Sequence, residues 1–215
     1  MPSTNKPAMD SRTIDAFKSK LVGGGARPNL FEVELQWPSF LTGLDDDVQE
    51  MARFMVKAAN LPASNITPID VPFRGRNLKI AGDRTFDVWT ITIINDTDFK
   101  LRNAFEIWMN GMNKHQDATG VTTPTDYQRD AYVYQLGRSA TDGVADLGEG
   151  GGSIPVLKAY KFHGVFPTNV SAIELSYDQP DTIEEFTVDL QVQWWDAFNK
   201  DGETILGTEG EGNGI

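Results

Sequence analysis

Three segments of this 215-residue chain carry residue types that could support catalysis or ion binding. Asp45-Asp46-Asp47 could open a calcium-binding loop, but that loop needs glycine at its sixth position, where this chain has Glu50. Residues 148–153 are rich in glycine but lack the lysine of a phosphate-binding loop. Glu184 and Glu185 could act as acid and base, yet neighbours on a strand point to opposite faces. We therefore expect no catalytic residues and no enzyme.

Metal and cofactor sites are not expected either. The chain has no cysteine and only two histidines, His115 and His163, which lie far apart in the sequence. Trp194-Trp195 could stack against a sugar, so a carbohydrate-binding β-sandwich stays open as an unrelated function. We expect instead that Trp194 continues the core-facing row of the last strand.

Composition favours a soluble globular protein. Hydrophobic residues make up 40% of the chain, and no apolar run approaches the length of a membrane span. The formal net charge is -12, which argues against tight binding to nucleic acid or to an anionic membrane. Ordinary solubility would explain the total charge equally well.

Alternating apolar residues predict a mainly β fold. The expected strands are Leu30–Trp37, Trp89–Ile94, Ala131–Leu136, Ile154–His163, Ser171–Tyr177 and Ile183–Trp195. Asp45–Ala59 is ambiguous between helix and strand, and we expect a strand from about Met51. One helix is expected from Asp96 or Thr97, because Leu101, Phe105 and Trp108 recur at helical spacing. We predict a β-sandwich or partial barrel with this single helix on its flank.

A projecting β-hairpin is predicted between the strand expected from about Met51 and the strand Trp89–Ile94. Ile66–Phe73 and Asn77–Ala81 flank the turn Arg74-Gly75-Arg76, and prolines 68 and 72 exclude a central position in a sheet. A further turn is expected at Ala81–Arg84. The remaining organisation is an N-terminal arm (1–26), the β-sandwich domain (27–196) and an acidic, glycine-rich tail (197–215).

The charges are distributed unevenly. The polar faces of the best-patterned strands carry acidic and neutral side chains but no lysine or arginine, whereas the hairpin region holds Arg74, Arg76, Lys79 and Arg84. Basic projections on an acidic body favour association between copies of the chain. Nucleic-acid binding by the hairpin is the alternative, but the hairpin lacks the interleaved aromatic residues that single-strand binding uses.

Several segments, in order along the chain, resemble the tail tube proteins of contractile-tailed (myovirus-type) bacteriophages. These segments are Arg27–Phe31, Leu61–Ala63, Asn77–Asp96, Phe166–Val170 and Glu185–Val188. The resemblance implies a structural virion protein, with six copies joining their sheets into a ring-shaped barrel. Rings would stack into a tube that conducts the genome during ejection, so the protein would reside in the virion tail and, during assembly, in the host cytoplasm.

The resemblance also implies partners and surfaces. The expected partners are other copies of the chain, the tail sheath, the baseplate and tube-terminating proteins, with double-stranded DNA passing through without sticking. Contacts between subunits or rings are expected at Arg74, Arg76, Lys79, Asp83 and Arg84. The channel is expected to be lined by Glu174, Glu185 and Asp189, together with Glu32 and Glu34. A tube initiator, a tube terminator, or the inner tube of a phage-like injection or secretion system remains the alternative.

Overall fold

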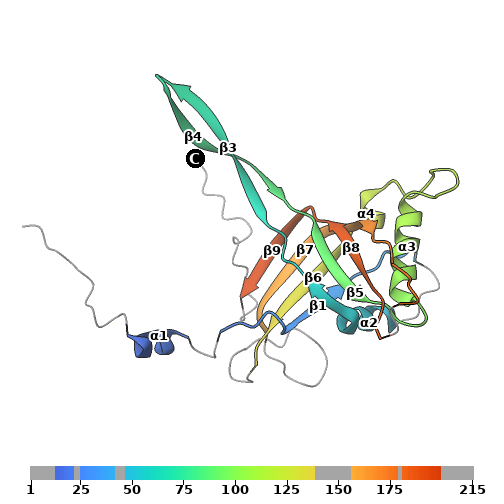
Figure 1. The fold of residues 1–215 in the computed structure, drawn as a ribbon. Coiled ribbons are helices and arrows are strands. Elements are labelled where there is room, and N and C mark those ends of the chain that lie inside the picture. Colours follow the sequence, from blue (N-terminus) through green and yellow to red (C-terminus); the bar gives the residue numbers. More distant parts are fainter. Residues whose placement is uncertain (1–12, 22–24, 42–46, 139–155, 179–180, 200–215) are drawn as a thin grey trace, which may run out of the picture.

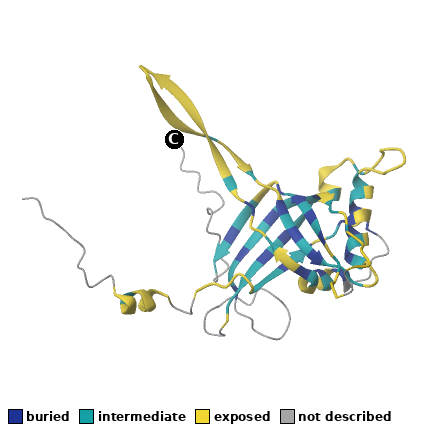
Figure 2. Cartoon of the chain, viewed as in Figure 1, coloured by how far each residue is buried: buried dark blue, intermediate teal, exposed yellow. Residues whose placement is uncertain are grey.

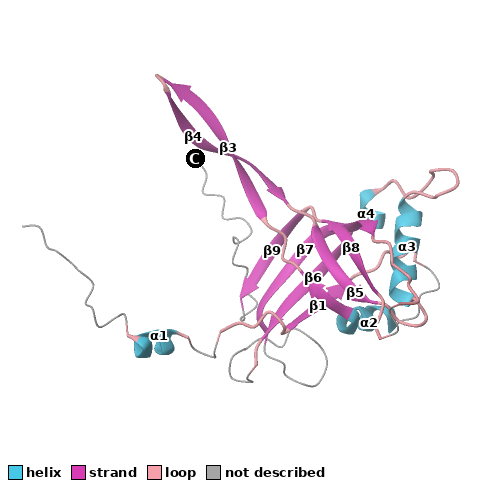
Figure 3. Ribbon diagram, viewed as in Figure 1, coloured by secondary structure: helices cyan, strands magenta, loops and turns pink. Residues whose placement is uncertain are grey.

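The computed structural model describes residues 13–21, 25–41, 47–138, 156–178 and 181–199 (Figure 1). Its helices are α1 (Ile14–Lys20), α2 (Asp47–Met55), α3 (Lys100–Met112) and α4 (Pro124–Tyr127). Its strands are β1 (Phe31–Leu35), β2 (Val56–Ala59), β3 (Ser64–Phe73), β4 (Arg76–Phe86), β5 (Trp89–Ile94), β6 (Arg129–Leu136), β7 (Val156–Val170), β8 (Glu185–Gln191) and β9 (Trp194–Asn199). The predicted mainly β fold is confirmed, and β3 and β4 form the expected projecting hairpin (Figure 3).

Seven strands form one antiparallel sheet in the order β1-β6-β7-β8-β5-β2, with β9 also paired to β7. The long strand β7 belongs to both halves of this sheet. Its first half pairs with β6 and β9, and its second half pairs with β8. We call β1, β6, β9 and the first half of β7 sheet A, and β2, β5, β8 and the second half of β7 sheet B.

Gly164 lies in β7 between the two halves and permits the change of direction. Its φ of +62° is in the left-handed region, and a Cβ there would lie 2.6 Å from Cγ of Gln193. Only glycine adopts this conformation without steric cost. Sheets A and B consequently fold toward each other and share one core.

Alternating side chains fill that core from both sheets. Val33 and Leu35 are buried from sheet A, and Ile91, Ile93 and Phe186 are buried from sheet B (Figure 2). Helix α3 adds Leu101, Ala104, Phe105 and Trp108, so the predicted helix does pack on the β structure. Trp37 makes edge contacts with Phe105 and Trp108, at ring-centroid distances of 5.1 and 5.8 Å. These contacts fasten α3 to the sheets.

The prediction of a strand from Met51 is wrong, because this segment forms the end of helix α2. Residues up to Met55 are helical, and the strand begins only at Val56. Val48 and Ala52 are buried one helical turn apart, so the helical reading of this ambiguous segment is the correct one. Helix α2 packs against edge strand β1 and against α3, and leads directly into the other edge strand, β2.

Four other expectations were wrong in detail. Residues 81–84 form no turn, because β4 runs unbroken to Phe86. Residues 171–177 form no strand, and the segment expected as one strand to Trp195 is divided into β8 and β9. The main helix begins at Lys100, whose backbone N–H donates to the Asp96 carboxylate over 3.1 Å. None of the described helices is both long and apolar enough to cross a membrane.

Phe105 provides a direct test of this packing. Replacing the fully buried Phe105 with alanine should lower the free energy of unfolding by about 3–5 kcal/mol, because a cavity would open between α3 and the sheets. Chemical denaturation of the purified subunit would measure the change. Phe54→Ala is the matched control, since that side chain is 76% exposed and its loss should change stability little. Equal losses for both variants would contradict the described core.

Candidate assembly surfaces

The β3–β4 hairpin has two chemically different faces. Cross-strand partners share a face, and the register pairs Ile69 with Ile80, Val71 with Leu78, and Phe73 with Arg76. All five of these apolar side chains are exposed. Monomeric proteins rarely expose such a continuous apolar strip, and an isolated two-stranded hairpin is only marginally stable in water. The apolar face is therefore a surface suited to burial against another molecule.

The opposite face of the hairpin is polar and internally paired. Lys79 Nζ lies 3.0 Å from Asp70 Oδ1, and these two residues are direct cross-strand partners. Pro68 and Pro72 lie on the same face as Asp70, and their cross-strand partners are Ala81 and Asn77. This side of the hairpin carries none of the exposed isoleucine, leucine, valine or phenylalanine side chains of the other face.

The predicted contact residues are distributed along the hairpin rather than gathered at one point. Arg74 and Arg76 flank the tip, and the Arg74 guanidinium lies 5.3 Å from the ring centroid of Phe73. Asp83 and Arg84 lie within β4 nearer the body, and Arg84 pairs with Ile66. Phe73 is thus one aromatic neighbour of an arginine at the tip, and it does not form the interleaved aromatic row that single-strand binding uses. The role of these five residues as contacts stays a prediction.

The outer face of sheet B is polar and carries Glu185 and Asp189. Asp189 accepts hydrogen bonds from Thr90 Oγ1 over 2.7 Å and from Asn169 Nδ2 over 3.1 Å, so it links β5, β7 and β8. Glu185 forms an ion pair with Lys57 from β2. Thr92 and Thr187 face each other between these groups. The surface is dominated by hydroxyl, amide and carboxylate groups.

Glu32 and Glu34 belong to a different surface, the outer face of sheet A. The Arg53 guanidinium from α2 lies 3.4 Å from Glu32 and 3.2 Å from Glu34. Tyr134 lies beside Glu34, with its hydroxyl 3.3 Å from the carboxylate. Burial raises the pKa of the Tyr134 phenol well above its usual range, and the charge of Glu34 raises it further. Both carboxylates are therefore held in a mixed charge network.

The predicted lining residues do not share one surface. Glu185 and Asp189 lie on sheet B, Glu32 and Glu34 lie on sheet A, and Glu174 lies in the exposed segment that follows β7. Sequence reasoning missed Arg53 and Lys57 as ion-pair partners: Arg53 lies in the helix that was expected as a strand, and Lys57 lies in β2, whose pairing the sequence does not reveal. It also missed the apolar hairpin face, although the alternation of Ile69, Val71 and Phe73 was a usable signal.

Sheet B has two edges that could receive further strands. Among the described strands, β2 pairs only with β5, and Phe166–Val170 of β7 pairs only with β8. The successive pairings are all antiparallel, so β2 and the second half of β7 run in opposite directions. Pro167, which has no N–H to donate, is compatible with such an edge position.

A further titratable cluster surrounds His163. Its Nδ1 lies 3.5 Å from Asp130 and its Nε2 lies 3.3 Å from Asp196, while its ring stacks on Trp194 at 3.7 Å. Trp194 is 45% exposed, so the expectation that it faces the core is wrong. Across the described ranges, no group of three or more histidine, cysteine, aspartate or glutamate side chains could hold a metal.

Solved structures share this fold with the chain. A chain of the anti-feeding prophage baseplate, determined by cryo-electron microscopy with sixfold symmetrisation, superposes with a TM-score of 0.54. The match covers 82% of this chain and 97% of that chain, at 9% identity. A chain of the tube-terminating cap of the anti-feeding prophage gives a TM-score of 0.52 over 81% and 91%, at 15% identity. A chain of the sheath/tube terminator of an extracellular contractile injection system also shares the fold, with a TM-score of 0.52 over 80% of this chain and 96% of that chain, at 11% identity.

Sequence comparison identifies the family. The family model described as phage tail tube protein matches residues 26–197. Tail tube protein gp19 of Enterobacteria phage T4 is 33% identical over 182 residues, covering 84% of this chain and 95% of gp19. The tail tube protein of Serratia phage KSP90 is 28% identical over 83% of this chain and 93% of that protein. The chain therefore belongs to the phage tail tube protein family, whose members are structural proteins.

Two substitutions distinguish the contribution of the Asp189 hydrogen bonds to stability from the contribution of its charge. Asp189→Ala should lower the free energy of unfolding by about 1 kcal/mol, because Thr90 and Asn169 both lose their acceptor. Asp189→Asn keeps one acceptor oxygen while removing the charge, so its loss should be smaller. Thermal or chemical unfolding of the two variants would measure the difference. If Asp189→Asn lowers the free energy of unfolding as much as Asp189→Ala does, the charge of Asp189 contributes more to stability than its hydrogen bonds.

Proposed function

We propose that this chain is the major subunit of a phage tail tube, in which rings of six copies stack into the inner conduit for genome ejection. The observation that carries the proposal is the form of sheet B, with four antiparallel strands and free edges that run in opposite directions. The sixfold symmetrisation of the baseplate with the same fold supports a ring of six. Electron microscopy of the purified chain, which should form rings or long uniform tubes, is the general test.

Side-by-side association through sheet B satisfies its free edges. If β2 of one copy lies beside the second half of β7 in the next, the antiparallel pattern continues without interruption. Six copies of a four-stranded sheet would close a barrel of about 24 strands, which is wide enough for an aqueous channel. Closure leaves no unpaired edge, so it also removes the tendency of open sheets to aggregate.

In this arrangement the outer face of sheet B lines the channel, and Glu185 and Asp189 are the lining carboxylates. Threonine and asparagine side chains between them can hydrogen-bond to water but cannot bind phosphate as cations do. Lys57 is neutralised by Glu185 and adds little attraction for a duplex. Double-stranded DNA would therefore pass without forming salt-dependent contacts. We do not extend this role to Glu32 and Glu34, because Arg53 engages both on the other sheet.

Stacking of successive rings is assigned to the hairpin. Its apolar face would be buried against a copy in the neighbouring ring, with Arg74 and Arg76 at the tip adding contacts to the acidic surface of that copy. Burial of the five apolar side chains supplies the main driving force, at roughly 25 cal/mol per Å² removed from water. Lys79, which already pairs with Asp70, contributes less.

The wider assembly follows from the same role. A sheath would surround the tube, a baseplate would hold its first ring, and a terminating protein would cap its last. The subunit would accumulate in the host cytoplasm and become part of the virion tail on assembly. An alternative is a tube initiator, a tube terminator, or the inner tube of a phage-like injection or secretion system. The match to a tube-terminating cap supports the terminator among these alternatives, and a terminator would form single rings rather than long tubes.

Adjacent residues of β4 distinguish the two hairpin faces. Leu78→Ser should abolish or shorten tubes, because it places a hydroxyl in the buried apolar strip. Lys79→Ser lies on the other face and should leave tube length nearly unchanged. Negative-stain imaging and sedimentation would measure assembly, and circular dichroism would verify that both subunits are folded. Tubes of normal length from Leu78→Ser, or their loss only in Lys79→Ser, would contradict the assignment.

Thr187 tests the channel face without disturbing the Asp189 hydrogen bonds. Thr187→Lys should permit assembly but cause tubes to retain short duplex DNA at low salt, with retention falling as salt rises. Thr187→Gln is the matched neutral control of similar length and should behave as the wild type. Fluorescent duplex binding to purified tubes would measure retention. If the lysine variant binds no more DNA than the glutamine variant, this face does not line the channel.

A further inference from the structure

Strand β9 forms the edge of sheet A opposite β1, and one of its two sides is unpaired. Across the described residues β9 pairs with β7 alone, in the register that places Trp194 opposite His163. The other side of β9 therefore presents amide and carbonyl groups that no described strand engages. Such an edge can accept an extended segment of another protein as an additional strand, because main-chain hydrogen bonds supply affinity and the neighbouring side chains supply specificity.

The side chains that β9 places on the outer face of sheet A alternate between aromatic and acidic. This row consists of Trp194, Asp196 and Phe198, whereas Ala197 points to the other side and is 3% exposed. The Trp194 side chain is 45% exposed, and the His163 ring stacks on it at 3.7 Å. One indole face is thus covered within the chain, and the other is open to a partner. An added strand would place every second side chain beside this row.

Asp196 lies at the centre of the row without a permanently charged partner. Its cross-strand neighbour Lys161 is directed to Asp130 instead, with Nζ 3.0 Å from that carboxylate. The ion-pair partner of Asp196 in the described ranges is His163, whose Nε2 lies 3.3 Å away and which is charged only when protonated. A cation supplied by another molecule could therefore pair with Asp196.

Arginine is the side chain that fits both Asp196 and Trp194. Its planar guanidinium binds a carboxylate through two parallel hydrogen bonds and also stacks on aromatic faces, which the lysine ammonium cannot do. With an arginine beside Asp196, the residues two positions before and after it would lie beside Trp194 and Phe198. Large apolar side chains at those two positions would bury the exposed aromatic surface.

We propose that β9 binds, as an added strand, an extended segment of a different protein that carries an arginine flanked two residues away on each side by large apolar residues. A second copy of this chain is a poor source. Among its arginines, only Arg53 lies between two such residues, Met51 and Met55, and it is held in helix α2. The inference rests on the ring proposed above only in placing sheet A on the side away from the channel, where other proteins can reach it.

Reversible disulfide capture on the cysteine-free full chain would measure this binding. Asn199→Cys places one thiol at the end of β9 and leaves the outer row intact. The probe is the peptide acetyl-Val-Thr-Arg-Thr-Val-Gly-Ser-Gly-Cys-amide, and the matched control peptide has glutamate in place of arginine. The arginine peptide should be captured about tenfold more than the control, because it gains a charge-assisted hydrogen bond. Mass spectrometry in a thiol buffer would measure the captured fraction.

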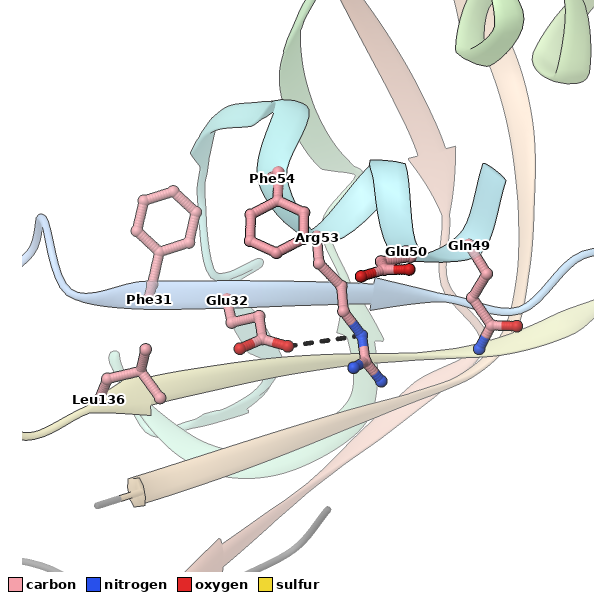
Figure 4. Close-up of a pocket in the computed structure, with 7 residues that line it drawn as sticks. All are labelled: Phe31, Glu32, Gln49, Glu50, Arg53, Phe54 and Leu136. Carbon is pink, nitrogen blue, oxygen red and sulfur yellow. Dashed lines mark ion pairs between the residues drawn. The ribbon is translucent and has the colours of Figure 1, made fainter. Parts of the chain in front are cut away.

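Substitutions in the chain and in the peptide would locate the site. Asp196→Asn should remove the preference for the arginine peptide, and Trp194→Ala should reduce it. Glu32→Gln is the matched control and should leave capture unchanged, because Glu32 lines a groove at the other edge of sheet A, where it pairs with Arg53 (Figure 4). Of two arginine peptides N-methylated at odd or at even positions, one should lose capture, because alternate N–H groups of a strand point to the same side.

The outcomes separate this site from the proposed function. Equal capture of the arginine and glutamate peptides, or an unchanged preference in Asp196→Asn, would overturn the site. Tubes that form normally without preferential capture would overturn the site alone. Preferential capture by a folded chain that forms no tubes would support the site and contradict the proposed function. Protection of the β9 amides from hydrogen exchange by tube formation alone would assign this edge to another copy and overturn the proposal.

Hydrogen exchange on the unmodified chain gives a second measurement if Asn199→Cys does not fold. The arginine peptide without its terminal cysteine, added in large excess, should slow the exchange of backbone amides in Trp194–Asn199. The glutamate peptide should slow it much less. Equal exchange of these amides with either peptide would overturn strand addition at β9.

Discussion

The unpaired edges of sheet B are the constraint on which the rest of this structure depends. A strand edge carries N–H and C=O groups that must find partners, and exposed edges invite pairing with other chains. Here one edge is the four-residue β2 and the other is the second half of β7, and their opposite directions allow each to complete the other in a second copy. In the proposed ring, pairing between copies would satisfy these edges and would make an otherwise aggregation-prone feature the basis of assembly.

The bend at Gly164 allows one chain to form two sheet surfaces of different chemistry. Because β7 passes from one half of the sheet to the other, the same core supports sheet A, with its network of Arg53, Glu32, Glu34 and Tyr134, and sheet B, with its Asp189 hydrogen bonds. The first surface holds paired charges beside a groove, whereas the second carries small polar groups. A division of this kind suits a protein with one side for partners and another for a passing polyanion.

Sequence patterns predicted those parts of the fold that depend on local periodicity and missed those that depend on tertiary context. The sequence predicted strands β1 and β5 from their alternating apolar residues and helix α3 from its apolar stripe. It also predicted the tight turn at Arg74-Gly75. Helix α2 was predicted wrongly because its apolar residues fit two periods, and only its packing against β1 and α3 favours the helix. The division of β8 from β9 was hidden because Gln193 and Trp194 preserve the alternation, while β9 pairs with a different part of β7. The family could be recognised, but the partner of Glu32 is Arg53 in the misread helix, and the partner of Glu185 is Lys57 in β2, which only the tertiary fold brings beside it.

The hairpin changes the physical account of how subunits would associate. A mechanism based on arginine and lysine meeting acidic neighbours would be weakened strongly by salt, since exposed ion pairs contribute about 0–1 kcal/mol each. The strip formed by Ile69, Val71, Phe73, Leu78 and Ile80 provides an attraction that salt does not screen. Basic tip residues then act mainly on the rate and direction of approach, where long-range charge is most effective. Apolar burial would hold the tube together, and charge would determine which end of a subunit meets which.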